Sequence, residues 1–309
     1  MDVLRMSLSG AGFLGAFHLG FAEALLKSGI QRTHRVEIAG ASAGALVGTV
    51  IATETSLSVA RDVLRELASR ARGAGPLGIL TPGFSLVEAV QSSLDEHLPS
   101  DAAQRASEAR FFVALNAVES GKTHYVTSWS TRDELIECVC ASSDIPGVTG
   151  LLRATTVQRD AGTESGPTTQ RTPLQRWLNR DDVDGGLFDL HPDPWRVEAA
   201  GTAASALSGA ANQSRGAMRR AVNASCAAED AGCEVHFVSP FSGGGLAVAP
   251  LRPTTGVLSL PVGHGRTADA SAANLVRALH ALRPPSDSVL AAYEAEGFAS
   301  AEKFFLNMV

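Results

Sequence analysis

The sequence predicts an α/β protein, and three observations support this fold class. Apolar runs at residues 3–8 and 35–39 each lead into a glycine turn, as strands do. Each run is followed by a stretch whose apolar residues have helical spacing, and this alternation is typical of α/β folds. With 309 residues, of which 45% are hydrophobic, the chain is long enough for one large domain or two small ones.

The strands and helices can be assigned in order along the chain. The N-terminal part is expected to form a strand at 3–10, a helix at 15–29, a strand at 35–40, a buried helix at 40–53 and helices at 56–73 and 84–99. A β-hairpin of 110–118 and 124–129, joined through Glu119, Ser120 and Gly121, and a helix at 130–143 are expected next. The C-terminal part is expected to form a strand at 234–241 and helices at 271–282 and 287–298. Ser85 with Glu88, and Thr131 with Glu134, have the spacing of a capping box, which predicts where two of the helices begin.

Two stretches interrupt this pattern, residues 153–182 and residues 199–232. The first is rich in Thr, Gln, Arg, Gly and Pro, the second is rich in Ala, Ser and Gly, and neither shows apolar periodicity. Segments of such composition bury too little apolar surface to offset the entropy of ordering them. We therefore predict that both are mobile insertions.

Charge and cysteine content exclude several functions. The formal net charge is −6 and the chain has no block rich in Lys and Arg, so we predict no nucleic-acid partner. The four cysteines lack the spacing of a zinc site and are too few for a disulfide scaffold, which predicts reduced thiols, no metal site and an intracellular protein. These cysteines are Cys138, Cys140, Cys226 and Cys233.

The N-terminus and the apolar runs indicate the cellular location. A glycine loop begins within the first ten residues, which leaves no room for a secretory signal segment. The longest weakly polar run, residues 40–53, is shorter than the roughly 20 apolar residues that a membrane span needs. We therefore expect a cytoplasmic protein.

The first glycine loop, "LSGAGFLGAFHLG" at residues 8–20, has Gly10, Gly12 and Gly15 spaced as G-x-G-x-x-G. Dinucleotide binding by such a loop requires an acidic residue about 20 positions further on, at the end of the next strand. Glu37 is the candidate, and it lies inside a strand that is still running. The loop is therefore either a tight turn or a cradle of backbone N–H groups for a different anion.

A second motif, G-x-S-x-G, stands between the second predicted strand and an apolar helix, at Gly40, Ser42 and Gly44. A sharp turn from strand to helix lifts a serine hydroxyl out of the sheet, and flanking glycines permit close approach of the backbone. The following helix also points its N-terminal dipole at the serine. We therefore predict Ser42 as a nucleophile and the glycine loop as the site for an oxyanion.

The C-terminal half offers two kinds of general base. His236, His264 and His280 occur where the chain order of an α/β-hydrolase would place a histidine. His236 falls in a strand pattern and His280 in a helix, which favours structural roles, whereas His264 is less easily dismissed as a base. Asp184, in "VDGGLFD", is the stronger candidate because it forms a set with the two earlier motifs, although Asp-Gly alone indicates only a turn.

The stretches "SGAGFLGAFHLG", "GASAG" and "DGG", in this order, resemble the patatin-like phospholipase domain. The Phe13-Leu14 pair in the first loop is similar to the animal-type triacylglycerol lipase and adiponutrin branch, whereas plant patatins carry a basic residue there. Similarity extends to "GFSLVEAV", "TSWSTRDELIECVCASSDIPG", "VSPFSGGGLAVAP" and the C-terminal helices. The resemblance implies one domain over residues 1–309, with a three-layer α/β/α fold and a mostly parallel central sheet.

Carried over by position, the resemblance implies a Ser–Asp dyad without histidine, in which Ser42 is the nucleophile and Asp184 the base. The other site residues are the elbow glycines Gly40 and Gly44 and the oxyanion-hole residues Gly10, Ala11 and Gly12. An aspartate of ordinary pKa, about 3.9, is a weak base toward a serine hydroxyl, so the dyad requires partial desolvation of the carboxylate. One departure is that Asp189 is followed by Leu190, where family members often have Asp-Asn.

The resemblance further implies a serine lipid acyl hydrolase, of the triacylglycerol lipase or phospholipase type, that needs no cofactor. We expect acylglycerol substrates at a membrane or lipid-droplet surface, to which the protein binds peripherally, and a protein co-activator is left open. Three alternatives are an acylglycerol transacylase, a catalytically weak lipid-binding scaffold of the same fold, and a nucleotide-binding module that uses only the first loop.

Overall fold

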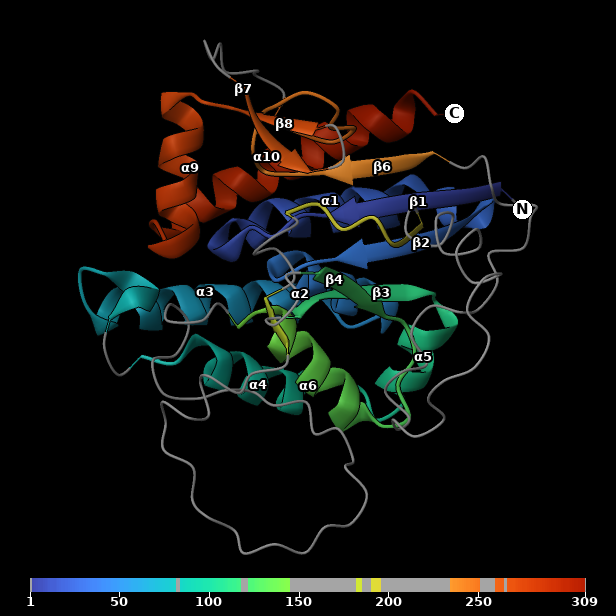
Figure 1. Cartoon of the computed structure of the whole chain (residues 1–309), viewed down its shortest axis with the longest axis horizontal. Helices are drawn as coiled ribbons and strands as arrows, with labels where there is room; N and C mark the ends of the chain where they lie inside the picture. The colour runs from blue at the N-terminus through green and yellow to red at the C-terminus, as the bar shows by residue number, and fades with distance from the viewer. Residues whose placement is uncertain are drawn as a thin grey trace, which may run out of the picture.

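The computed structural model of the chain describes residues 2–81, 84–117, 122–144, 182–184, 190–195, 234–250, 259–263 and 266–308 (Figure 1). Several predictions concern other residues and lie outside this part of the chain. They are the insertion at 199–232, the insertion at 153–182 except for its last residue, the hairpin turn at 119–121, Cys226, Cys233 and His264.

A mixed sheet of mostly parallel strands forms the centre of the molecule (Figure 1). Its strands are β1 (Asp2–Leu8), β2 (His34–Gly40), β3 (Phe111–Ala117), β4 (Lys122–Val126), β5 (Asp182–Asp184) and β6 (Val235–Val238). The order is β4-β3-β2-β1-β6, with parallel pairing of β1 to β2 and β6 and of β2 to β3. β4 and β5 both pair antiparallel with β3. The predicted α/β class and the predicted hairpin strands are confirmed.

Helices alternate with the strands as the sequence predicts. They are α1 (Gly15–Ser28), α2 (Ala43–Ala52), α3 (Leu57–Ala74), α4 (Leu86–His97), α5 (Ala102–Glu108), α6 (Arg132–Ser142), α9 (Ala272–Leu282) and α10 (Asp287–Leu306), with 3-10 turns η1 (Gly12–Leu14), η2 (Ile30–Arg32) and η3 (Gly78–Leu80). Both predicted caps form, because the side chains of Ser85 and Thr131 accept hydrogen bonds from the N–H groups of Glu88 and Glu134. The short helix α5 and the hairpin of β7 (Ser259–Gly263) and β8 (Arg266–Asp269) were not predicted.

The two faces of the sheet bury different side chains because successive residues of a strand point to opposite sides. Leu4, Met6 and Leu8 of β1 join the main core, to which α1, α2, α6 and α10 contribute. The other face carries a smaller cluster of Ala39, Ala41, Phe112, Ala114, Tyr125 and Trp195. In Figure 1 the segment 190–195 crosses in front of β1, whereas α1 and α10 lie behind it. The described residues thus show the sheet and one helical layer of the expected three-layer arrangement.

Glu37 of β2 has a structural role on the face of the smaller cluster. Its fully buried carboxylate lies 2.9 Å from Nε of Arg110 and 3.3 Å from Nε of Arg5. It also accepts a hydrogen bond of 2.9 Å from the indole N–H of Trp195. A buried carboxylate needs such partners to offset its desolvation, so Glu37 is engaged within the fold and does not serve as a ribose ligand after the glycine loop.

Two further observations bear on the predicted location and thiols. No described helix combines the length and the apolar character needed to cross a membrane. Cys138 and Cys140 of α6 are buried thiols that form no disulfide among the described residues, and burial raises the pKa of the Cys140 thiol to about 12. Both therefore act as small apolar residues of the core, as predicted.

Candidate active site

Ser42 stands on the turn between β2 and α2, where it is the residue before the first turn of the helix. Its backbone has φ 52° and ψ −122°, a conformation that residues other than glycine rarely adopt. The side chain is partly exposed, in contrast to its buried neighbours Ala41 and Ala43. The structure therefore places the serine on a strained strand-to-helix turn that presents its hydroxyl outward, as a nucleophile elbow does.

The two glycines of the motif are required by close packing. A Cβ at Gly40 would lie 2.4 Å from the carbonyl oxygen of Gly44, and a Cβ at Gly44 would lie 2.3 Å from the carbonyl oxygen of Leu8. The N–H of Ala41 donates to that same Leu8 carbonyl at 3.3 Å. Glycine at both positions therefore lets the turn lie directly against the end of β1.

A residue that sequence reasoning missed, Ser142 of α6, holds the turn from its other side. The backbone N–H of Ser42 donates to the Ser142 hydroxyl at 3.1 Å, and this hydroxyl donates to the carbonyl oxygen of Ala114 in β3 at 2.7 Å. Ser142 is fully buried. Because one hydroxyl links the elbow to the sheet, Ser142 is a positioning residue for Ser42. Its place within the family-like stretch "CASSDIPG" is the one signal that the sequence contained.

Replacing Ser142 with alanine is expected to lower kcat for ester hydrolysis about ten- to a hundredfold, because small displacements of a nucleophile are costly. The change also leaves the Ala114 carbonyl and the Ser42 N–H without their partner, which should destabilise the fold by about 1–3 kcal/mol. Urea denaturation and initial rates with a soluble ester measure both effects. Ser143→Ala is the matched control, because the Ser143 hydroxyl donates to the carbonyl oxygen of Val139 in α6 and not to the elbow or to β3 among the described residues. Equal rates for the two variants would contradict the positioning role.

The glycine loop lies beside the elbow. Ala11 and Leu14 pack with Ala43, the residue after Ser42, in a small buried cluster. The N–H of Gly10 already donates to the carbonyl oxygen of Leu190 at 3.1 Å. Among the described residues, the N–H groups of Ala11 and Gly12 meet no backbone or side-chain acceptor, and Gly12 is exposed. Of the three predicted oxyanion-hole residues, Ala11 and Gly12 therefore have donors to offer, whereas the donor of Gly10 is engaged.

His18 of α1 stabilises the start of this loop. Its Nε2–H donates to the carbonyl oxygen of Ser9 at 2.9 Å, and the ring is fully buried. Burial lowers the pKa of His18 to about 4, so the ring is neutral at physiological pH. It fixes the backbone at the start of the loop and is not placed as a general base.

Asp184 is the last residue of β5, and the strand register locates its backbone. It pairs with Leu115 of β3, and Gly40 pairs with Val113 of the same strand. β4 pairs with β3 across residues 113–117, so β5 and β2 must share the opposite edge of β3. Two residues of strand correspond to about 7 Å. The backbone of Asp184 thus lies just beyond the end of β2, where the turn that carries Ser42 begins.

The two candidate histidines within the described residues are engaged elsewhere. His236 of β6 pairs with Met6, its ring packs edge-on to Phe304 at 5.0 Å, and burial lowers its pKa. His280 of α9 shares a hydrogen bond of 2.9 Å between its Nδ1 and the Tyr293 hydroxyl, and burial lowers its pKa also. Both partners belong to α10, which gives these histidines structural contacts.

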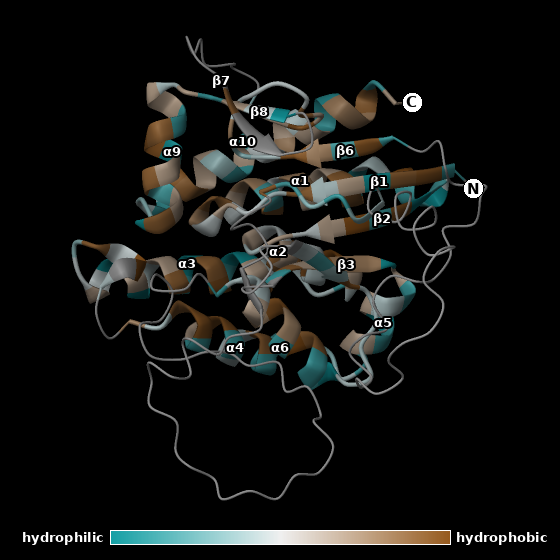
Figure 2. Ribbon diagram, in the orientation of Figure 1, coloured by the Kyte–Doolittle hydropathy of each residue, from teal (hydrophilic) through white to brown (hydrophobic). Residues whose placement is uncertain are grey.

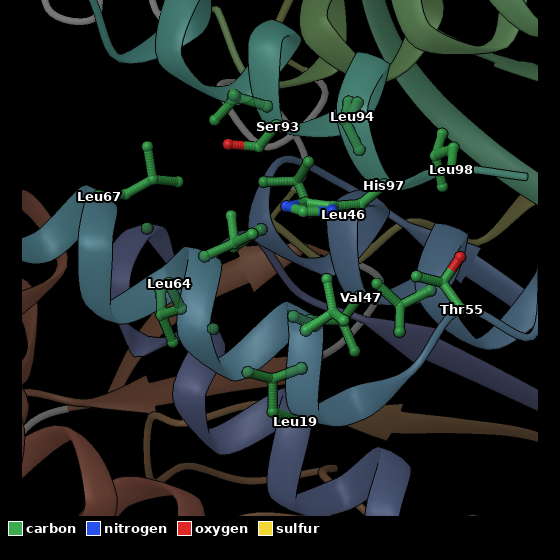
Figure 3. Close-up of a pocket in the computed structure, with 18 residues that line it drawn as sticks. Leu19, Leu46, Val47, Thr55, Leu64, Leu67, Ser93, Leu94, His97 and Leu98 are labelled. Atoms are coloured by element: carbon green, nitrogen blue, oxygen red, sulfur yellow. The ribbon is translucent and has the colours of Figure 1, made fainter.

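An apolar groove lies between α1, α2, α3 and α4 (Figure 3), and its lining includes Ala43, the residue after Ser42. Its cavity measures about 110 Å³, smaller than the roughly 300–1,000 Å³ of most ligand pockets. Gly12 and Ala43 place it beside the glycine loop and the elbow. The remaining lining residues are Gly15, Leu19, Leu46, Val47, Val50, Thr55, Val59, Ala60, Val63, Leu64, Leu67, Val90, Ser93, Leu94, His97 and Leu98. The groove thus presents an apolar surface beside the residue that follows Ser42.

In the part of the chain that the structure describes, no three side chains of His, Cys, Asp or Glu are grouped as metal ligands.

Fold and site together define an α/β protein that presents a serine on a strained elbow beside a glycine loop. Residues 6–192 match the patatin-like phospholipase family, and because this is more than half of the sequence, the chain belongs to that family. The resemblance seen in the three motifs is thereby confirmed.

Curated relatives match about half of the chain. Patatin-like phospholipase domain-containing protein 2 of Rattus norvegicus is 36% identical over 152 residues, 49% of this chain and 31% of that protein. Patatin-like phospholipase domain-containing protein 4 of Homo sapiens is 32% identical over 153 residues, 49% of this chain and 60% of that protein. The human 1-acylglycerol-3-phosphate O-acyltransferase PNPLA3 is 32% identical over 153 residues, 48% of this chain and 30% of that protein. The chain thus spans less than two thirds of the length of each relative.

Proposed function

We propose that the chain is a serine lipid acyl hydrolase that cleaves fatty-acyl esters through an acyl-enzyme on Ser42. The observation that carries this proposal is the apolar groove beside the residue that follows Ser42. A groove lined by leucine and valine suits a long acyl chain, and an elbow serine at its side suits attack on the ester carbonyl. Membership of the patatin-like phospholipase family supports the same chemistry.

In the proposed reaction, Oγ of Ser42 attacks the carbonyl carbon of the ester while the carboxylate of Asp184 accepts the hydroxyl proton. The N–H groups of Ala11 and Gly12 stabilise the negative charge on the carbonyl oxygen of the tetrahedral intermediate. When the intermediate collapses, the alcohol leaves with the proton and the acyl group stays on Ser42. Water then attacks the acyl-enzyme by the same route, and the fatty acid is released.

The acceptor of the acyl group decides between hydrolysis and acyl transfer. Similarity to the human protein named 1-acylglycerol-3-phosphate O-acyltransferase PNPLA3 supports an acylglycerol transacylase as the second candidate. The two activities are separated by their products when a labelled acyl donor is incubated with excess monoacylglycerol. Labelled free fatty acid indicates hydrolysis, and labelled diacylglycerol indicates transfer.

We further propose acylglycerols as the substrates and the surface of a membrane or lipid droplet as the place of reaction, with the protein bound there from the cytoplasm. The apolar lining of the groove and the resemblance to the animal-type lipase branch support the substrate class. Requirement for a protein co-activator is tested by comparing purified protein with protein in cell extract on the same lipid emulsion.

Replacing Leu94 with tryptophan tests whether the groove holds the acyl chain. Leu94 of α4 is half-buried and lines the groove, so a larger ring at this position should shorten the space beside Ser42. We expect kcat/KM for long-chain esters to fall about tenfold or more while the value for butyrate esters changes little, since loss of each buried methylene weakens binding. A series of p-nitrophenyl esters of increasing acyl length measures the shift.

Leu86→Trp is the control for this variant. Leu86 lies on the same helix, is also half-buried and packs against the core outside the groove. It should alter stability without changing the preference among acyl lengths. An unchanged preference in Leu94→Trp, with the protein folded, would remove the groove from the proposed function.

A further inference from the structure

Helix α9 turns its polar side inward and its apolar side outward. Its exposed large side chains are Leu275, Val276, Leu279 and Leu282, with 64%, 46%, 59% and 36% of their surfaces accessible. Its other exposed positions are Ala272 and Ala278. Surface helices of globular proteins usually show the opposite arrangement. Figure 2 shows the resulting hydrophobic residues along α9, at the edge of the molecule.

The polar side of α9 is held firmly against the protein. Buried Asn274 donates to the backbone carbonyls of Ser242 and Asp269, each at 2.8 Å. Buried Arg277 makes two hydrogen bonds of 3.0 and 3.1 Å to the carboxylate of Glu296 in α10. These contacts, together with the bond of His280 to Tyr293, fix the rotation of the helix. These contacts hold α9 in place with its apolar face toward the surface, so the exposure of this face does not come from local unfolding of the helix.

The same helix borders the candidate active site. A Cβ at Gly12 would lie 2.2 Å from the carbonyl oxygen of Ala281, so α9 packs directly on the loop that offers the oxyanion donors. Ala281 also packs against the cluster of Ala11, Leu14 and Ala43. The exposed apolar face thus belongs to an element that touches the loop beside Ser42.

The surroundings of α9 extend this face and set its charge. Leu77, 55% exposed, precedes η3, and Gly78 of that turn lies against the end of α9 near the Leu282 carbonyl and Arg283. Residues 270–286 contain no Asp or Glu, and Arg283 is exposed. An apolar helix face whose own segment lacks acidic residues and ends at a cation suits a phospholipid surface, whose apolar chains lie beneath phosphate groups.

We propose that the apolar face of α9, formed by Leu275, Val276, Leu279 and Leu282, docks the protein on a lipid surface and brings the glycine loop and Ser42 to that surface. The choice of lipid as the occupant rests on the proposed acyl hydrolase function. The face adjoins the loop of the candidate active site, so a second protein bound here would crowd the place that a lipid substrate must reach. Contiguous apolar patches on a protein surface often mark interaction sites.

Flotation with vesicles of dioleoylphosphatidylcholine tests the docking directly. The double variant Leu275→Gln/Leu279→Gln is expected to lose about tenfold or more of the vesicle affinity, because two exposed leucines no longer enter the bilayer. Both side chains are exposed, so the fold and the hydrolysis of soluble p-nitrophenyl butyrate should persist. Binding is measured in the Ser42→Ala background, which separates docking from catalysis.

The matched control is Leu26→Gln/Leu306→Gln, which changes two leucines that are 49% and 72% exposed on α1 and α10. The C-terminal end of α10 lies on the opposite side of the view from α9 (Figure 1). This control should bind vesicles like the parent. Equal vesicle binding by both double variants would overturn the docking proposal, as would a dimer in sedimentation analysis that only the α9 variant dissolves. Vesicle binding without butyrate hydrolysis in the unmodified protein would instead contradict the hydrolase proposal while leaving the docking intact.

Discussion

Replacing Ser42 with alanine is expected to reduce ester hydrolysis by on the order of 10⁴-fold or more, because no other group on the elbow can form the acyl-enzyme. The fold should persist. The Ser42 side chain makes no capping hydrogen bond to α2, and its backbone N–H, which bonds to Ser142, is unaffected by the change. Initial rates with a soluble ester and circular dichroism measure the two expectations.

The same variant decides between an enzyme and a scaffold of the same fold. A fluorophosphonate probe should label the unmodified protein at Ser42 and fail to label Ser42→Ala. Ser93→Ala is the matched control, because Ser93 also lines the groove while its hydroxyl donates to the Ala89 carbonyl within α4. Absence of labelling in the unmodified protein, or more than a few per cent of activity in Ser42→Ala, would contradict the assigned nucleophile.

Local signals were sufficient for most of the fold. Apolar runs ending in glycine predicted β1 and β2, and helical spacing with capping residues predicted α4 and α6 near their observed bounds. The elbow could also be predicted from adjacent residues, because a strand, two glycines and a helix that follow one another in sequence determine its geometry. The helix α5 was missed because its seven residues, "AAQRASE", are too short for a clear apolar period.

Features that depend on tertiary contacts could not be predicted. Ser142 lies 100 residues from Ser42 in sequence, and nothing local shows that its hydroxyl links the elbow to β3. The engagement of the Gly10 donor depends on Leu190, which is even more remote in sequence. The groove is built from four helices and has no pattern of its own.

The apolar periodicity of α9 also did not predict which of its faces is buried. Its sequence, "AANLVRALHAL", predicts an amphipathic helix, and the usual assumption buries the leucines. In the structure the partners of Asn274 and Arg277 lie inside the protein, so hydrogen bonds and an ion pair determine which side faces inward. Periodicity shows that a helix has a polar face and an apolar face, whereas the positions of its polar partners determine which face is buried.

The general base is tested by replacing Asp184 with asparagine. An amide cannot accept the serine proton, so we expect the rate of ester hydrolysis to fall by about 10²–10⁴-fold, the loss typical of a general base. The similar shape of asparagine should preserve stability. Asp181→Asn, Asp182→Asn and Asp189→Asn are internal controls that should retain most of the rate, and initial rates with a soluble ester at saturating concentration give the comparison.

Histidine variants distinguish a Ser–Asp dyad from a triad that includes a histidine. His236 and His280 are engaged with residues of α10, whereas the register of β5 places the backbone of Asp184 just beyond the strand that leads into Ser42. His236→Gln, His264→Gln and His280→Gln should therefore cost far less activity than Asp184→Asn. A folded histidine variant as inactive as Asp184→Asn would reject the Ser–Asp dyad, because a histidine would then be accepting the serine proton and Asp184 would act through it.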